Sequence, residues 1–247
     1  MAEPKWLQDM NPEEYLKEDF EATGHSRYTV DGLEKNDPEW LDKAAAKVNA
    51  AEGDDYVKLD SGLLTVNQIN WMLRNTFGEL TFVDDNNQFL WYNRPQDPNY
   101  KMKARRVPAQ VGDTMGAVHP DIRDVIPNAK KVVHALRTKE GGHDEVWMPV
   151  PTGNLTELVL HYYKRVEDEE GNYMGIYEWV QDIYPFVKYF CEVTGQKLVV
   201  DPDATTGATY RRNSDPDAKT GPSTKADAAK EEVKAAEPEA TSGASHH

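Results

Sequence analysis

The most constraining feature of this chain is an ordered series of strand patterns between Leu80 and Ile183. An apolar run at 79–83 is followed by the turn residues Asp85-Asn86-Asn87 and by a second run at 88–92. Three more strand patterns, at about 144–150, 155–166 and 173–183, come after a helical stretch. Strands joined by short polar turns pair antiparallel. The pattern therefore predicts one curved antiparallel sheet around a helical crossover, with a pocket between them.

The strand at 155–166 carries large side chains on both of its faces, with Leu158, Leu160 and Tyr162 on one and Val159, His161 and Tyr163 on the other. A strand with one solvated face would alternate between apolar and polar residues. Both faces therefore need cover. We expect helices and the pocket on one face, and the N-terminal helix or a second subunit on the other.

Helix signals surround the strands. Asn11-Pro12 begins a first helix with an apolar stripe that reaches Phe20, and Gly24 can end it. A second helix begins near Trp40, and the capping box at 65–68 begins a third, which reaches about Thr76. Further helices are predicted at about 111–119, 127–139 and 184–193.

Composition limits the classes of function. The formal net charge is −15, which disfavours nucleic acid and anionic membranes as partners. The single cysteine, Cys191, excludes a disulfide framework within one chain. No secretory signal and no apolar run long enough to span a bilayer is present, so a cytoplasmic location is expected. Residues from about 205 onwards are polar and small, and we expect that tail to be disordered.

Four segments resemble a PAS domain: LTFVDDNNQFLWYN at 80–93, VGDTMGAVHPD at 111–121, EVWMPVP at 145–151 and YYKRVEDEEGNYMGIYEWVQDI at 162–183. The resemblance covers about 59–190. It is strongest to the bacterial PAS module that accompanies a domain of unknown function and a hemerythrin-like domain. It implies an α+β fold with a five-stranded antiparallel sheet flanked by helices, used for ligand sensing and dimerisation.

The same resemblance sets the expected organisation. Residues 1–58 form an acidic helical extension, 59–193 form the PAS domain with its leading and trailing helices, and 194–247 form a linker and tail. The chain lacks a Gly-x-Ser-x-Gly motif and a Gly-rich phosphate loop, so we predict no enzymatic activity. The predicted function is a sensory or regulatory module that binds a small ligand, forms a homodimer and signals to a separate protein partner.

Candidate pocket residues are the large side chains of the strands and the apolar side chains of the helices. They are Phe82, Trp91, Met115, His119, Val133, Leu136, Trp147, Leu160, Tyr162 and Ile176. Two alternatives stay open. In one, haem bound through His119 or His134, or a noncovalent flavin, makes the protein a redox sensor. In the other, the aromatic side chains fill the interior and the domain only binds proteins. No other metal site is predicted.

Overall fold

The computed structural model describes residues 3–21, 28–34, 37–94, 97, 99–119, 125–150, 152, 154 and 156–199. The predicted disordered tail and the predicted helix stop at Gly24 lie outside these residues. None of the described helices is long and apolar enough to cross a bilayer.

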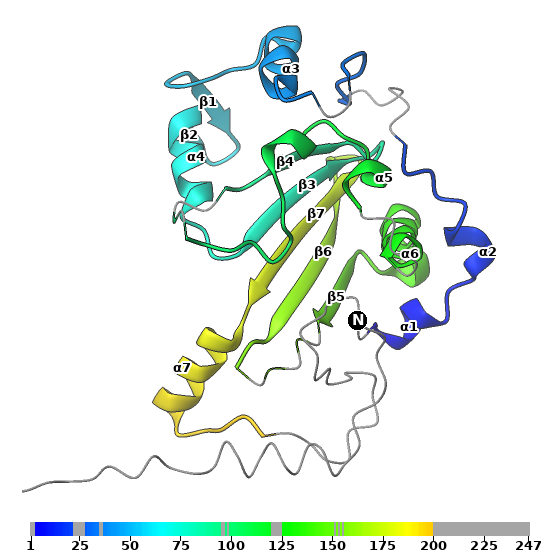
Figure 1. Ribbon diagram of the computed structural model, residues 1–247, viewed down its shortest axis with the longest axis vertical. Coiled ribbons are helices and arrows are strands. Elements are labelled where there is room, and N and C mark those ends of the chain that lie inside the picture. The colour runs from blue at the N-terminus through cyan, green and yellow to red at the C-terminus, as the bar shows by residue number, and fades with distance from the viewer. Residues whose placement is uncertain are drawn as a thin grey trace, which may run out of the picture.

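The centre of the molecule is a five-stranded antiparallel sheet (Figure 1). Its strands are β3 (Glu79–Asp84), β4 (Phe89–Tyr92), β5 (Glu145–Val150), β6 (Val159–Glu167) and β7 (Tyr173–Asp182). Their spatial order is β4-β3-β7-β6-β5, so the longest strands, β7 and β6, lie inside the sheet. The α+β class and the five-stranded antiparallel sheet predicted from the sequence are confirmed.

Two local features fix the register of the sheet. At the β3–β4 turn, Asp84 Oδ1 accepts hydrogen bonds from the backbone N–H groups of Asn86 at 3.0 Å and Gln88 at 2.7 Å. Asn87 has a φ of +62°, a left-handed conformation that asparagine tolerates. In β7, Gly175 has a φ of +137°, and a Cβ there would lie 2.1 Å from the Val83 carbonyl oxygen. Only glycine allows β3 and β7 to approach so closely at this point.

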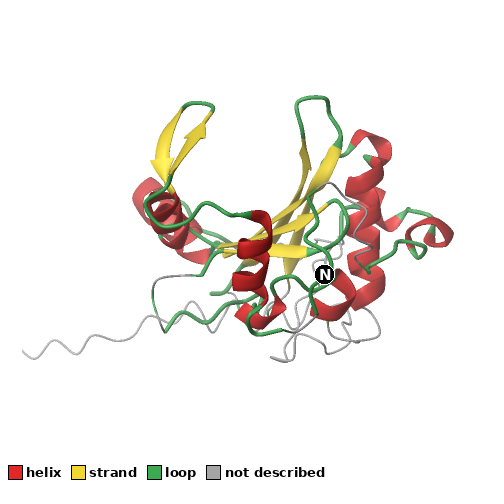
Figure 2. Cartoon of the chain, turned by 90° about the horizontal axis from the view of Figure 1, so that it is seen from above, coloured by secondary structure: helices red, strands yellow, loops and turns green. Residues whose placement is uncertain are grey.

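Short helices cover one face of the sheet, which we call the inner face. They are α5 (Met115–Val118) and α6 (Val125–Thr138). The one-turn helices η1 (Pro108–Gln110) and η2 (Glu140–Gly142) lie in the connecting loops. Leu136 of α6 is fully buried against Val146 and Met148 of β5 and Ile176 of β7. Figure 2 shows helices on both sides of the sheet when the chain is seen from above.

Residues 3–21, the N-terminal strap, pack against α6 rather than against the opposite, outer face of the sheet (Figure 1). The strap contains α1 (Lys5–Gln8) and α2 (Pro12–Tyr15). Leu7 has no exposed surface and shares the core of α6. The expectation that the N-terminal helix covers the second sheet face is therefore wrong.

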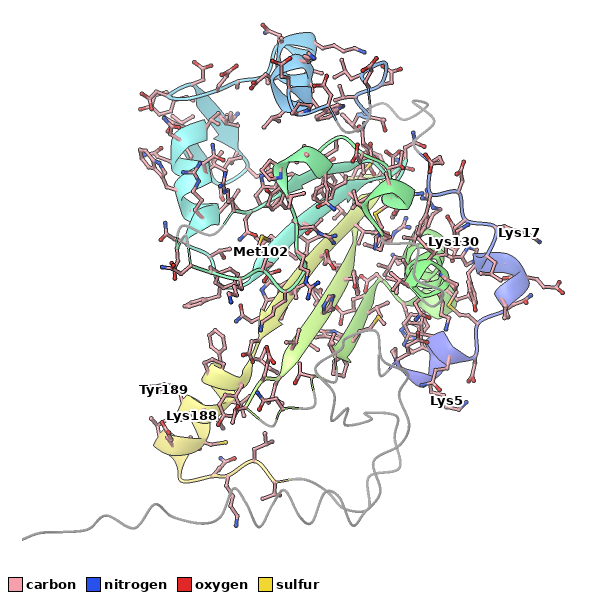
Figure 3. The ribbon with its side chains drawn as sticks, in the orientation of Figure 1. Lys5, Lys17, Met102, Lys130, Lys188 and Tyr189 are labelled. Atoms are coloured by element: carbon pink, nitrogen blue, oxygen red, sulfur yellow. The ribbon has the colours of Figure 1, made fainter. Side chains whose placement is uncertain are left out.

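The charge pattern explains where the strap docks. Residues 1–60 contain 16 acidic and 7 basic side chains. The side of α6 that faces the strap is basic. Lys131 Nζ lies 2.8 Å from Glu3, and His134 Nδ1 lies 2.7 Å from Glu18. Lys130 Nζ donates to the Leu16 carbonyl at 3.1 Å, and Figure 3 shows Lys130 on the side of α6 that the strap covers. The predicted helix ends early, at Tyr15, because Phe20 is buried in an extended segment instead.

The other elements lie at the ends of the sheet. The predicted helix at Trp40 is confirmed as α3 (Trp40–Val48), and α4 (Val66–Arg74) has the predicted capping box of Thr65 with Gln68. The terminal helix is α7 (Tyr184–Thr194). A hairpin of β1 (Tyr56–Leu59) and β2 (Gly62–Thr65) was not predicted. Its strands are mostly exposed and bury only Thr65 at their end, so they lack the apolar alternation on which strand prediction depends.

Truncation of Leu7 tests whether the strap belongs to the core. We expect Leu7→Ala to lower the free energy of unfolding by about 2–4 kcal/mol because a buried leucine leaves a cavity. Leu41→Ala is the matched control, since Leu41 is 61% exposed on α3. Urea denaturation followed by tryptophan fluorescence measures both variants. Equal midpoints for the two variants would show that the strap is not part of the cooperative core.

Candidate ligand cavity

A cavity of about 220 Å³ lies between the inner face of the sheet and the helices α5 and α6. Its walls are mainly apolar, and they include Val83, Phe89, Val132, Val133, Met148 and Ile176. Its polar lining consists of Arg106, His119, Asn128, His161, Tyr163 and Glu178. An apolar hollow with a few converging polar groups is the usual form of a small-molecule site.

The polar groups of the sheet wall form one buried cluster. Arg106 Nη2 donates to Glu178 Oε2 at 2.8 Å, and the two side chains are only 12% and 9% exposed. His161 Nδ1 lies 3.0 Å from the Tyr163 hydroxyl and 3.4 Å from Glu178 Oε1. Alternation along the strands places these side chains on one face, because His161 and Tyr163 are two residues apart in β6.

Burial and charge act in opposite directions on Glu178. Burial by itself raises the pKa of the Glu178 carboxyl, but the charge of Arg106 and the contact with His161 outweigh it. The pKa of Glu178 is therefore well below its ordinary value, and the carboxylate is ionised at neutral pH. Burial raises the pKa of the Tyr163 hydroxyl, and the charge of Glu178 raises it further. The cluster thus holds one fixed positive and one fixed negative charge beside a neutral phenol.

A second buried carboxylate positions Arg106. Glu79 in β3 is 1% exposed, and its two oxygens accept hydrogen bonds from the backbone N–H groups of Lys103 at 2.6 Å and Ala104 at 2.7 Å. The Tyr100 hydroxyl also donates to Glu79, at 3.0 Å. These bonds hold the loop at 99–107 against the inner face. Arg106 reaches the cavity because this loop is fixed only two residues before it.

His119 lies at the end of α5 and lines the cavity. Its Nδ1 is 2.8 Å from the Met115 carbonyl oxygen. Burial lowers the pKa of His119, and the nearby charge of Arg106 lowers it further, against the effect of the Met115 hydrogen bond. The imidazole is therefore neutral at pH 7. Since a carbonyl oxygen only accepts, the proton is on Nδ1, and Nε2 is an acceptor.

The structure brings four of the ten predicted pocket residues to the cavity: Met115, His119, Val133 and Ile176. Leu136 lies beside them in the core but does not line the hollow. The other five, Phe82, Trp91, Trp147, Leu160 and Tyr162, lie on the outer face. Their placement differs from the prediction because successive strand residues alternate, and the largest side chains occupy the outward positions.

The predicted haem ligands are placed differently from each other. His119 lines the cavity, as described above. His134 follows Val133 on α6 and points to the strap, where its Nδ1 is held by Glu18. Val132 and Val133 line the hollow, and His134 lies about 200° around the helix from Val132, on the side that the strap covers. The described residues contain no cluster of three or more side chains suited to a metal ion.

Four polar lining residues are absent from the predicted pocket: Arg106, Asn128, Tyr163 and Glu178. His161, which the predicted pocket likewise leaves out, also lines the cavity. One signal was available for Glu178. It is a single carboxylate inside the apolar run Ile176–Val180, in a strand that is central to the sheet, and a buried charge of this kind needs a partner.

This fold, a five-stranded antiparallel sheet with an internal hollow under its helices, defines a small domain of the α+β class. The sequence profile of the PAS domain family matches residues 69–184, and the chain is a PAS domain protein. The match does not test the narrower resemblance to the PAS module that accompanies a hemerythrin-like domain in other proteins. PAS domains are typically sensory rather than catalytic.

Two solved structures are similar to this chain. One is a C-terminal domain from Streptococcus mutans, with 33% sequence identity and a TM-score of 0.50, and the match covers 56% of this chain and 99% of that domain. The other is VqmA of Vibrio cholera in a complex with ligand and DNA, with 18% identity and a TM-score of 0.33, and the match covers 56% of this chain and 61% of that one. No curated protein matches the chain.

Removal of the Glu178 charge tests the buried cluster. We expect Glu178→Gln to lower the free energy of unfolding by about 3 kcal/mol, because Arg106 is then buried without a counter-charge. Glu145→Gln, a change to a half-exposed carboxylate on the outer face, is the control and should leave the midpoint near that of the wild type. The double variant Arg106→Met with Glu178→Met should lose less than the sum of its two single variants.

The lowered pKa of Glu178 also sets the pH dependence of this effect. The carboxylate contributes its full stability above its unfolded-state pKa of about 4.3, and loses it as the pH falls towards the folded-state value. The difference in unfolding free energy between the wild type and Glu178→Gln should therefore narrow between about pH 5 and about pH 3. A constant difference over this range would contradict the pairing.

Proposed function

We propose that this chain is a sensory or regulatory module whose PAS domain binds a small molecule in the cavity between the sheet and α5 and α6. The observation that carries the proposal is the hollow itself, with apolar walls and a buried polar cluster. Its volume of about 220 Å³ is below the range of about 300–1,000 Å³ typical of sites for drug-sized ligands. A compact guest therefore fits the cavity better than a large one.

The strap offers a route from the cavity to the surface. The Gly116 N–H of α5 donates to the Phe20 carbonyl at 3.1 Å, and the rings of Phe20 and His119 lie 6.2 Å apart. The Thr114 hydroxyl donates to Glu21 at 3.2 Å. A guest that favours one position of α5 and α6 also favours one docked state of the strap, which is a population shift. We propose that a separate protein partner reads this difference.

The outer face of the sheet supports the proposed homodimer. It carries an aromatic band of Phe82, Trp91, Trp147, Tyr162, Tyr177 and Trp179. Trp147 is 48% exposed, and beside the band Phe77 of the α4–β3 loop and Phe186 of α7 meet edge to face at 5.3 Å. Figure 3 shows Tyr189 projecting from α7, and this side chain is 68% exposed. A second copy of the chain would bury the exposed parts of these aromatic side chains.

The two alternatives are less well supported. For a domain with a filled interior, the aromatic side chains would have to occupy the hollow, but those of Phe82, Trp91, Trp147 and Tyr162 lie on the outer face. For a haem sensor that uses His134, this side chain would have to leave Glu18 and turn towards the cavity. His119 already lines the cavity, but a hollow of about 220 Å³ is below the range typical of drug-sized ligands, and haem and flavin are larger still. A cytoplasmic location, the division at residues 58 and 193 and the lack of catalysis remain part of the proposal.

Xenon under pressure tests whether the cavity admits a guest, because apolar cavities bind this atom. In methyl NMR spectra, the signals of Val133, Met148 and Ile176 should shift, and that of Leu160 on the outer face should not. Ala129→Phe places a ring in the hollow and should abolish the shifts. Ala46→Phe, on the exposed side of α3, is the matched control. Shifts that are absent in the wild type, or unchanged in Ala129→Phe, would refute the cavity as a binding site.

Sedimentation equilibrium tests the dimer. Trp147→Glu should raise the dissociation constant of the dimer at least about tenfold, because it places a charge in the aromatic band. Tyr56→Glu changes an aromatic residue that is 70% exposed on the β1–β2 hairpin, and it should leave the constant unchanged. A wild-type chain that stays monomeric at millimolar concentration would contradict the proposed homodimer.

A further inference from the structure

The polar lining of the cavity is balanced in charge, and this limits what the cavity can hold. This inference rests on the proposed function. Arg106 and Glu178 contribute one charge of each sign, and they are paired with each other at 2.8 Å. The neutral His119 adds no charge. A charged guest would lose its hydration without gaining an unpaired counter-charge in return.

Some of the polar groups that line the cavity have hydrogen-bond partners within the protein, and others do not. On the sheet wall, Glu178 is occupied by Arg106, and His161 by Tyr163. On the helical wall, His119 Nδ1 is occupied by Met115, and Nε2 has no hydrogen-bond partner among the described residues. The Asn128 amide of α6 likewise has none within the described part of the chain. The groups that are left for a guest are therefore an acceptor, His119 Nε2, an amide that both donates and accepts, and one donor, the buried Arg106 Nε, which has no hydrogen-bond partner among the described residues.

We propose that the cavity takes a small uncharged molecule with an apolar, ring-sized body and at least one O–H or N–H group, which donates to His119 Nε2. Asn128 supplies the second polar contact from the same wall. The apolar body lies between Val133 of α6 and the sheet residues Met148 and Ile176. Neutral phenols and N–H heteroaromatic compounds belong to this chemical class, and carboxylates and amines that are ionised at neutral pH do not.

An outer groove provides an internal comparison. It has a volume of about 560 Å³ and is lined by the cations Arg94, Lys101 and Arg105, with Asp97 as the acidic residue. Arg106 lines both this groove and the cavity. A small anion is therefore expected to collect at the groove, and its NMR effects should be separable by position from those of a guest in the cavity.

Three probes of similar size test the proposal: phenol, anisole and benzoate. Phenol has an O–H donor, anisole has the same ring without a donor, and benzoate is an anion. Titrations are followed by the methyl signals of Val133 and Ile176 in the full chain. We expect phenol to bind about fivefold more tightly than anisole, which is the value of one ordinary hydrogen bond. Benzoate should leave these two signals unmoved.

The donor contact is tested by His119→Phe, which keeps a ring at this position and removes the acceptor. In this variant phenol and anisole should bind equally. His143→Phe is the matched control, because His143 stacks on Trp6 at 4.0 Å and does not line the cavity. A readout that needs no variant is the nitrogen chemical shift of His119 Nε2, which should move towards the hydrogen-bonded position with phenol and stay in place with anisole.

The outcomes separate this inference from the proposed function. If xenon shifts the cavity methyl signals but phenol has no advantage over anisole, or benzoate binds as well as phenol, the cavity is a site and the inference is wrong. The same holds if xenon enters and none of the three aromatic probes does. If xenon itself does not enter, the proposed function fails, and the inference fails with it.

Discussion

The buried pair of Arg106 with Glu178 is the interaction on which the interior of this domain depends. It joins a loop outside the sheet to the central strand β7, and both side chains are almost fully buried. Two ions in such a place are costly unless each satisfies the other. Glu79 helps to position Arg106 beside Glu178, because it holds the backbone of the same loop at Lys103 and Ala104. Two carboxylates from two strands thus fix one arginine, and they keep the floor of the cavity polar without giving it a net charge.

The strand pattern in the sequence was enough to predict the fold. It was not enough to predict the cavity lining, because that depends on how the side chains pack. Turn residues such as Asp84 to Asn87 and the capping box at Thr65 act locally, so they could be read directly from the sequence. Which side chains of each strand face the cavity could not be read from the sequence. His161 and Tyr162 are neighbours of similar size, and only the tertiary fold decides which of them faces the hollow. The prediction placed four residues of the aromatic band, Phe82, Trp91, Trp147 and Tyr162, inside, whereas other residues of the same strands line the cavity.

Tertiary packing also explains why the first helix ends earlier than its sequence predicts. Its sequence is compatible with a helix as far as Phe20. Burial of the Phe20 side chain in the core stabilises the fold more than an additional helical turn with this side chain exposed would. The extended conformation of the strap also brings Glu18 to His134 and Arg137. The acidic excess of the N-terminal segment, which suggested only solubility, is therefore complementary to the basic side of α6. A contact of this kind depends on two segments more than a hundred residues apart, and neither shows it alone.

The cavity lies between the strap and the outer face of the sheet, and these two surfaces are held in place by different interactions. On one side, the strap is held by ion pairs and by the buried side chains of Leu7 and Phe20, which pack in the core of α6, so its docking responds to movements of α6. On the other side, the aromatic band of the outer face is rigid, because it is built on strands that pair along their whole length. A guest that displaces α5 or α6 would change the first surface far more than the second. In a homodimer built on the aromatic band, the strap would then carry the signal while the dimer stays assembled.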